Sequence, residues 1–273
     1  MPAFFSLYTH KEMLIIFIFE FKENNLIKLH MIEIVDLHKS FNGKQVLNGV
    51  NLTIEEGETS VIIGKSGSGK SVLLKHIVGL LFPDKGYVKV GGQIIDPHNL
   101  KELYNIRRKF GYLFQGAALF DSMTVGENIA LPIIENENNL SAAELNKKIS
   151  KMLELVDLPN TENLKPAELS GGMKKRVGLA RALITEPEYI LYDEPTTGLD
   201  PIMSDSIDAL IKNLADQLNV TSIVVTHDMF SVKNVADEIA MVHEGKIYFE
   251  GTPAELISSK DKIITDFINR TGF

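Results

Sequence analysis

An eight-residue segment, GKSGSGKS at residues 64–71, constrains the fold of this chain more than any other feature. It matches the pattern G-x-x-x-x-G-K-[ST], a loop whose backbone N–H groups surround a bound phosphate. A short apolar run, residues 59–63, precedes it, and the helix-forming run VLLKHIVGL follows it. This order of strand, loop and helix is the setting that such a loop requires, because the helix N-terminus adds positive partial charge. The alternative is a flexible glycine-serine loop, but the flanking pattern favours a nucleotide-binding loop.

Each part of this loop has an expected role toward a nucleotide. Lys70 is expected to reach the β- and γ-phosphates, and the Ser71 hydroxyl is expected to occupy one Mg²⁺ position. The predicted phosphate-binding residues are Gly64, Lys65, Ser66, Gly67, Ser68, Gly69, Lys70 and Ser71.

Length, charge and cysteine content limit the possible functions. A chain of 273 residues can bury a substantial core, and we expect one α/β domain with a helical insertion. The formal net charge of -8 argues against a protein that coats nucleic acid, since phosphate neutralisation needs a basic face. The absence of cysteine excludes disulfides and thiolate metal sites, and a reducing cytoplasm is compatible with it.

Residues 1–30 differ in pattern from the rest of the chain. Their apolar stretch, residues 13–19, lies between charged residues and is far shorter than the roughly 20 residues of a membrane span. No small-residue cleavage site follows it, so it is also a poor signal peptide. We therefore expect an accessory tail or an upstream start-site error, with the folded domain beginning at Met31. A protein truncated to start at Met31 should fold and hydrolyse ATP.

Polar residues follow two strongly apolar strand patterns. Asp193 and Glu194 come after the run YILY, and His227 comes after the run TSIVVT. A continuous apolar run is typical of a strand buried on both faces of a parallel sheet. Ligands bind at the carboxyl ends of such strands, so these three side chains should meet at one edge. The alternatives are helix capping for the two carboxylates and a structural role for the histidine.

Two further positions carry weaker signals. Phe41 lies at an Asn42-Gly43 turn between two strands and could stack on a purine or pack in the core of a small sheet. Gln115 directly follows the predicted strand 110–114 and could reach a metal-bound or attacking water, although most glutamines are merely surface residues.

A second potential anion-binding element is the segment LSGGMKKRVGLARA, residues 169–182. Ser170 is a good helix N-cap, and Gly171 and Gly172 would let a ligand approach the N–H groups of the following helix. Common turn chemistry explains Ser-Gly-Gly equally well when it is considered alone. Lys174, Lys175 and Arg176 are expected to form a solvated helix face.

Taken together and in order, GKSGSGKS, Gln115, LSGG, YILYDEP, Asp200 and His227 resemble the nucleotide-binding subunit of ABC transporters. The resemblance covers residues 31–251 and implies an α/β fold with a P-loop NTPase core and a mostly parallel sheet. It also implies a small antiparallel β subdomain and a helical signature subdomain at about residues 116–180. Residues 252–273 would then form a C-terminal helical tail.

The resemblance implies a role for each matching residue, with ATP and Mg²⁺ as cofactors. Lys70, Gln115, Glu194 and His227 would be catalytic, and Ser71, Gln115 and Asp193 would ligate the metal. Phe41 would stack on the adenine, where the family more often has Tyr. Ser170, Gly171, Gly172 and Asp200 would contact ATP bound to a second copy, because the family implies a head-to-tail homodimer.

Within the family, the segments QGAALFDSMTVGENIALP and LSGGMKKRVGLARAL look most like the ATPase of MCE-type lipid transporters. This likeness implies a separate membrane permease, an MCE-type lipid-binding protein, a small regulatory subunit and a place on the cytoplasmic face of the inner membrane. Residues 116–132 are the expected permease contact, or else plain subdomain core. The alternatives are a transporter for another substrate, a soluble ABC ATPase of the translation-factor or DNA-repair kind, and a regulatory module that does not hydrolyse ATP. No long coiled-coil insertion separates Lys70 from Ser170, which favours the transporter.

Overall fold

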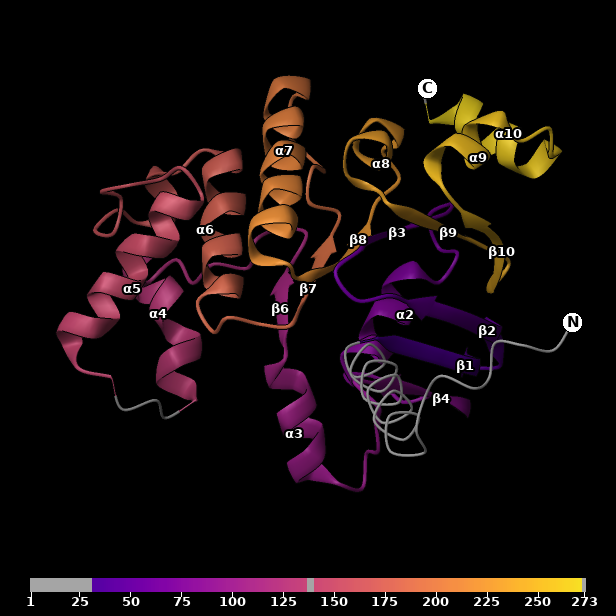
Figure 1. The fold of residues 1–273 in the computed structure, drawn as a ribbon, viewed down its shortest axis with the longest axis horizontal. Helices are drawn as coiled ribbons and strands as arrows, with labels where there is room; N and C mark the ends of the chain where they lie inside the picture. The colour runs from indigo at the N-terminus through magenta and orange to yellow at the C-terminus, as the bar shows by residue number, and fades with distance from the viewer. Residues whose placement is uncertain (1–30, 137–139, 272–273) are drawn as a thin grey trace, which may run out of the picture.

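The computed structural model describes residues 31–136 and 140–271 (Figure 1). The expected accessory tail, residues 1–30, lies outside the described residues and stays a prediction. Within the described ranges, no helix is both long and apolar enough to cross a membrane.

A six-stranded sheet forms the centre of the molecule, with the strand order β10-β9-β3-β8-β7-β6. Five strands run parallel, and only β10 at one edge is antiparallel to its neighbour. The inner strands β3, β7 and β8 are almost wholly buried, as their continuous apolar patterns predict. The strands are β3 (Thr59–Ile63), β6 (Phe110–Leu113), β7 (Tyr189–Asp193), β8 (Thr221–Val225), β9 (Glu238–His243) and β10 (Lys246–Gly251).

A second, four-stranded antiparallel sheet has the order β2-β1-β4-β5. Helix α2, which follows the glycine-rich loop, packs between the two sheets and shares one hydrophobic cluster with both. This packing fixes the loop relative to the central sheet. The elements are β1 (Ile32–Phe41), β2 (Lys44–Ile54), α2 (Lys70–Ile77), β4 (Lys85–Val90) and β5 (Gln93–Ile94), and α3 (Leu100–Arg108) leads back to β6.

The other face of the central sheet is covered by helices, which form a second hydrophobic cluster. Three of them, α4, α5 and α6, form the lobe at the left of Figure 1. Ser141 and Glu144, three residues apart, form a capping box at the start of α5. The helices are α4 (Val125–Glu135), α5 (Ala142–Leu155), α6 (Gly171–Leu183), α7 (Pro201–Leu218) and α8 (Met229–Val235), with a 3-10 turn η2 (Pro166–Glu168) before α6.

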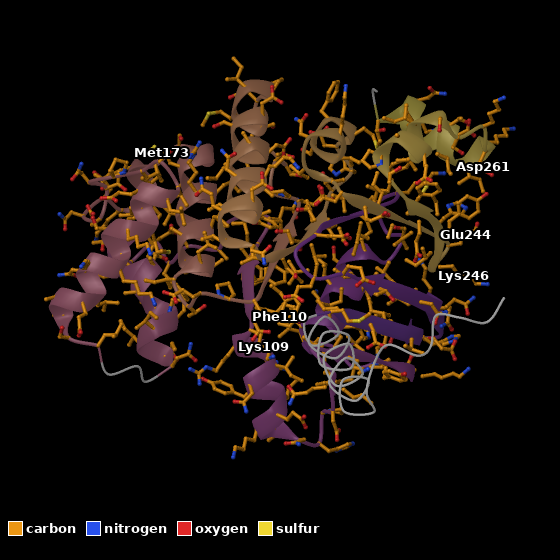
Figure 2. The ribbon with its side chains drawn as sticks, in the orientation of Figure 1. Lys109, Phe110, Met173, Glu244, Lys246 and Asp261 are labelled. Atoms are coloured by element: carbon orange, nitrogen blue, oxygen red, sulfur yellow. The ribbon has the colours of Figure 1, made fainter. Side chains whose placement is uncertain are left out.

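The chain ends in two short helices, α9 (Pro253–Ser258) and α10 (Lys262–Arg270), beside β9 and β10. Asp261 caps α10 and accepts a hydrogen bond of 2.9 Å from the Tyr248 hydroxyl. Figure 2 shows Asp261 on the same side of the molecule as Glu244 and Lys246 of the β9–β10 turn. Ile264 and Phe267 are buried against the body, so α10 is packed onto the domain.

The α/β architecture agrees with the expectation from the sequence, including the hairpin of β1 and β2 that turns at Asn42-Gly43. The helical spacing predicts one apolar face for α7, formed by Ile207, Leu210, Ile211, Leu214 and Leu218, and one of these side chains is exposed. Leu218, the last residue of α7, is 41% exposed, because the helix has passed the edge of the core there.

Candidate nucleotide-binding site

An open cavity of about 660 Å³ lies at the carboxyl ends of the parallel strands. It brings together residues that are separated by up to 163 positions in the sequence but were predicted to act together. The predicted residues that line it are Gly64, Lys65, Ser66, Gly67, Gly69, Lys70, Ser71, Gln115, Asp193, Glu194 and His227.

The glycine-rich loop needs glycine at its first and sixth positions for steric reasons. A Cβ at Gly64 would lie 2.4 Å from the Val242 carbonyl oxygen, and the φ of Gly64 is +149°. A Cβ at Gly69 would lie 2.8 Å from a Leu47 methyl group, and its φ of +108° is also unfavourable for other residues. Because both sites exclude a side chain, the loop backbone can follow a tight path around an anion.

Lys70 is 7% exposed and points back over its own loop. Its ammonium donates hydrogen bonds to the carbonyl oxygens of Gly64 at 2.8 Å and Lys65 at 3.2 Å. Burial lowers the pKa of Lys70, while the nearby carboxylates of Glu194 and Asp193 act in the opposite direction. The result is a cation fixed at the loop, next to the N-terminus of α2.

Glu194 is positioned by three contacts at the end of β7. Its N–H donates to Val225 of β8 at 2.9 Å, and its backbone has a φ of +52°. One carboxylate oxygen accepts from the Thr197 hydroxyl at 3.0 Å and lies 2.8 Å from His227 Nδ1. The carboxylate is therefore held in one orientation inside the cavity.

Asp193 differs from Glu194 in its surroundings. Burial raises the pKa of Asp193, and the Tyr112 hydroxyl, which donates to it at 3.2 Å, partly opposes that shift. Asp193, Gln115 and Ser71 all line the same cavity with oxygen donors, which are the ligands that Mg²⁺ prefers. The residues present therefore fit a magnesium ion, because a cation there would also stabilise the desolvated carboxylate.

A second group of predicted residues lies outside this cavity. Ser170 caps α6 by accepting a hydrogen bond from Met173 N–H at 3.3 Å, and Asp200 caps α7 by accepting from Met203 N–H at 3.0 Å. The two helix starts are in contact, since a Cβ at Gly172 would meet Met203. Gly171 and Ser170 are exposed, and α6 has no acidic residue in its first turn. The structure thus gathers Ser170, Gly171 and Asp200 on a separate surface with two helix N-termini, while the neighbouring Gly172 is buried.

Phe41 lies at the end of β1, 40% exposed, with the Lys39 ammonium 5.6 Å from its ring centre. It is not among the residues that line the cavity, whereas Val46 of β2 is. Its stacking on adenine stays a prediction.

The cavity also contains residues that the sequence did not indicate. The end of α10 contributes Phe267, Arg270 and Thr271 to its wall. No local pattern could have placed them, because their position depends on how the tail packs on the body. The expectation of a solvated Lys174–Arg176 face is wrong for Lys175, which is 5% exposed.

Similarity to known proteins indicates the family of the chain. The sequence pattern of the family described as ABC transporter matches residues 47–197. The chain is 38% identical over 239 residues to the intermembrane phospholipid transport system ATP-binding protein MlaF of Haemophilus influenzae, covering 88% of this chain and 90% of MlaF. The chain belongs to the ABC transporter family. The cassettes of this family bind and hydrolyse ATP, and they work as dimers together with membrane permeases.

Other relatives differ in their named substrates. The chain is 40% identical over 238 residues to the probable ribonucleotide transport ATP-binding protein mkl of Mycobacterium tuberculosis, covering 87% of this chain and 66% of that protein. It is 41% identical over 217 residues to the methionine import protein MetN of Legionella pneumophila, covering 80% of this chain and 63% of MetN. The chain thus spans about two thirds of the length of these relatives.

Solved structures show the same fold. The dimeric cassette MJ0796 bound to ADP and Pi superposes with a TM-score of 0.74 at 34% identity, covering 81% of this chain and 98% of that one. The cassette cbiO1 of Clostridium perfringens superposes with a TM-score of 0.78 at 29% identity, covering 88% of this chain and 94% of that one.

Proposed function

We propose that two copies of this chain bind two ATP molecules between them, each clamped by the Lys70 cavity of one copy and the Ser170–Gly172 turn of the other. One observation carries the proposal: the predicted ATP contacts fall on two separate surfaces of the described chain. The cavity contains the phosphate loop and the catalytic carboxylate, and the second surface presents helix N-termini that can bind an anion. A two-fold dimer unites both surfaces at two equivalent sites.

The hydrolysis step uses Glu194 as its base. A water oxygen bonds to the γ-phosphorus, the bond from that phosphorus to the β,γ-bridging oxygen breaks, and the water proton passes to the Glu194 carboxylate. The products are ADP and phosphate. Lys70 stabilises the developing negative charge, which is the main catalytic requirement of phosphoryl transfer. His227, which lies 2.8 Å from Glu194, and Gln115, which lines the same cavity, sense whether the γ-phosphate is present.

Ser71, Gln115 and Asp193 would hold Mg²⁺ in this cavity. When bound, the ion neutralises phosphate charge and aligns the β- and γ-phosphates. Asp193 supplies the charged ligand, and Tyr112 fixes its orientation through the 3.2 Å hydrogen bond.

A glutamine at position 194 tests this assignment. Glu194→Gln keeps the shape of the side chain and its contacts to Thr197 and His227 but removes the base. We expect ATP binding to be unchanged and phosphate release to fall at least 100-fold, which is typical of losing a general base. Glu194→Asp, which keeps the carboxylate, serves as a control with partial activity. Wild-type turnover by Glu194→Gln would refute the role of Glu194.

We also propose that a groove between the central sheet and the helical lobe contacts a permease. The groove has a volume of about 420 Å³ and is lined mainly by apolar side chains from β6, α4 and α6. Two phenylalanines at its rim, Phe114 and Phe120, are 42% and 50% exposed. Exposed aromatic residues around a groove are typical of a protein contact. The lining of the groove includes residues from the predicted permease contact, residues 116–132. That segment follows Gln115 directly in the sequence.

The absence of cysteine from the sequence makes this contact easy to test. A single cysteine in place of Phe120 should cross-link to a permease subunit in native membranes. Ile257→Cys, on the surface of α9, provides a control with similar exposure that should not cross-link. Equal cross-linking of the two variants would count against the groove as the permease contact.

The cargo that we propose is phospholipid, moved across or between bacterial envelope membranes. The relative MlaF, which matches over almost its full length, supports this proposal, and MetN represents the alternative of a small-molecule importer. The proposed partners are a permease, an MCE-type lipid-binding protein and a small regulatory subunit, with no nucleic acid. The proposed location is the cytoplasmic face of the inner membrane, peripheral through the permease.

A tagged chain purified from native membranes can distinguish these cargoes. Its co-purified permease, reconstituted in vesicles, should transfer fluorescent phospholipid only with ATP. Methionine should leave the ATPase rate unchanged. Stimulation by methionine without lipid transfer would replace the lipid proposal with an importer.

A further inference from the structure

Helix α6 presents two buried cations to the chain segment that follows β6. Lys175 and Arg181 are 5% and 9% exposed, and they lie on one helix face with Gly178 between them. Gly178 permits close approach, because a Cβ there would lie 2.9 Å from Leu113 and 3.2 Å from Ala117. This face of α6 is therefore packed against the Gln115 segment.

Arg181 fixes the shape of that segment. Its guanidinium donates to the carbonyl oxygens of Ala117 at 2.6 Å and Ala118 at 2.8 Å. Both alanines have positive φ values, 59° and 47°, which are unfavourable without such support. The segment and α6 consequently form one unit.

Lys175 makes a connection of a different kind. Its ammonium donates to the carbonyl oxygen of Gln115 and, at 3.2 Å, to the carbonyl oxygen of Glu194. Gln115 belongs to the segment beside the permease groove, and Glu194 belongs to the end of β7. Lys175 itself is five residues after Ser170, on the helix whose N-terminus faces a partner's ATP in the proposed dimer. The Lys175 side chain therefore connects α6, the Gln115 segment and the end of β7.

A simple packing role does not account well for this lysine. Burial of an ammonium is costly, and it lowers the pKa of Lys175 despite the nearby carboxylates of Glu194 and Asp193. An apolar side chain of similar length, such as methionine, would fill the same space without that cost. The two carbonyl contacts are what the ammonium adds.

We propose that Lys175 is a positioning residue for hydrolysis: it fixes the backbone at Glu194 relative to α6 and the Gln115 segment. When a partner's ATP binds or a permease moves the groove, the helical lobe rotates. The contact of Lys175 with the backbone transmits this movement to Glu194. The inference rests on the catalytic role proposed for Glu194. It predicts that Lys175 affects the rate of the chemical step and leaves ATP binding nearly unchanged.

The experiment compares Lys175→Met and Lys175→Arg with the matched control Lys174→Met, one position away and outside the contact. Steady-state phosphate release gives kcat and KM for ATP, and thermal unfolding reports stability. We expect Lys175→Met to lower kcat about 10- to 100-fold, as a small misplacement of a catalytic group does. Its KM should change less than about 3-fold and its Tm should not fall, because a costly buried charge is removed. Lys175→Arg should recover most of kcat, and Lys174→Met should match the wild type.

Several results would overturn the inference. The first is a kcat of Lys175→Met within 2-fold of the wild-type kcat. The second is a loss of kcat in Lys174→Met equal to that in Lys175→Met. If Lys175→Met does not fold, Lys175→Leu, which also lacks a donor, replaces it under the same criteria. Glu194→Gln is measured in parallel: its normal turnover overturns the role of Glu194 and this inference with it. An inactive Glu194→Gln beside a normal Lys175→Met overturns this inference alone.

Discussion

Asp208 provides a quantitative test of how burial affects this fold. It lies on α7 with 2% of its surface exposed, and its Oδ1 atom has no hydrogen-bond partner among the described residues. Its other oxygen lies 3.5 Å from the Asn234 amide, which is a weak contact. Burial raises the pKa of Asp208 from 3.8 to about 6, with Ser231 and Asn234 opposing the shift. The charged form is thus unfavourable in the folded protein.

The sign of the effect on stability follows from proton binding. Between pH 3.8 and about 6 the folded state binds more protons at Asp208 than the unfolded state does, so stability falls as pH rises through this window. Above about pH 6 the penalty is complete, and below about pH 4 it disappears. A shift of about two pKa units corresponds to roughly 3 kcal/mol. Asp208→Asn, which cannot ionise, should therefore raise the free energy of unfolding by about 1–3 kcal/mol near pH 8.

Urea unfolding of wild type and Asp208→Asn at several pH values between about 4 and 8 measures this difference. The gain should be largest at the alkaline end and shrink toward zero near pH 4. Asp216→Asn, at an exposed position on the same helix, is the control and should show little pH-dependent gain. Destabilisation by Asp208→Asn near pH 8, or a gain that is independent of pH, would refute the reasoning.

Three predictions concern the nucleotide. Lys70→Ala should weaken ATP binding by roughly 10- to 100-fold in a titration. The substitution removes a hydrogen bond to a charged group, and such a bond contributes about 1.5–3 kcal/mol. Unchanged affinity would contradict the phosphate-loop assignment. Phe41→Ala should weaken ATP binding by about 1–3 kcal/mol without changing inhibition by tripolyphosphate, which has no base to stack; equal losses would exclude stacking. Arg270→Ala should weaken ATP binding a few-fold. This loss of affinity should shrink at high salt, because the Arg270 charge is exposed. A loss that does not depend on salt would indicate a packing effect instead.

The sequence predicts most of the proposed ATP-binding cavity, because parallel strands place their carboxyl ends at one edge. Asp193 and His227 each follow a continuous apolar run, so their shared position follows from sheet geometry alone. The loop at residues 64–71 is equally predictable, since its spacing reflects the steric demand for glycine seen at Gly64 and Gly69.

The remaining parts depend on packing between distant segments. Arg270 reaches the cavity only because Ile264 and Phe267 fix α10 on the body, and no periodicity in the tail specifies that contact. The basic run Lys174–Arg176 predicts a solvated helix face, and this prediction is wrong for Lys175, which is buried. The one available signal was its spacing from Gly178, a small residue that marks the packed face of α6.

In the proposed dimer, two chains enclose ATP between the Lys70 cavity and the Ser170 turn. The most direct test of this arrangement is the sedimentation of Glu194→Gln with magnesium and saturating ATP, and with ADP in its place. We predict a particle of twice the chain mass with ATP and a single chain with ADP. Adding Ser170→Glu, which places a negative charge at the partner's phosphates, should abolish the dimer. A single chain at saturating ATP, or a dimer that tolerates Ser170→Glu, would contradict the proposed arrangement of the two chains.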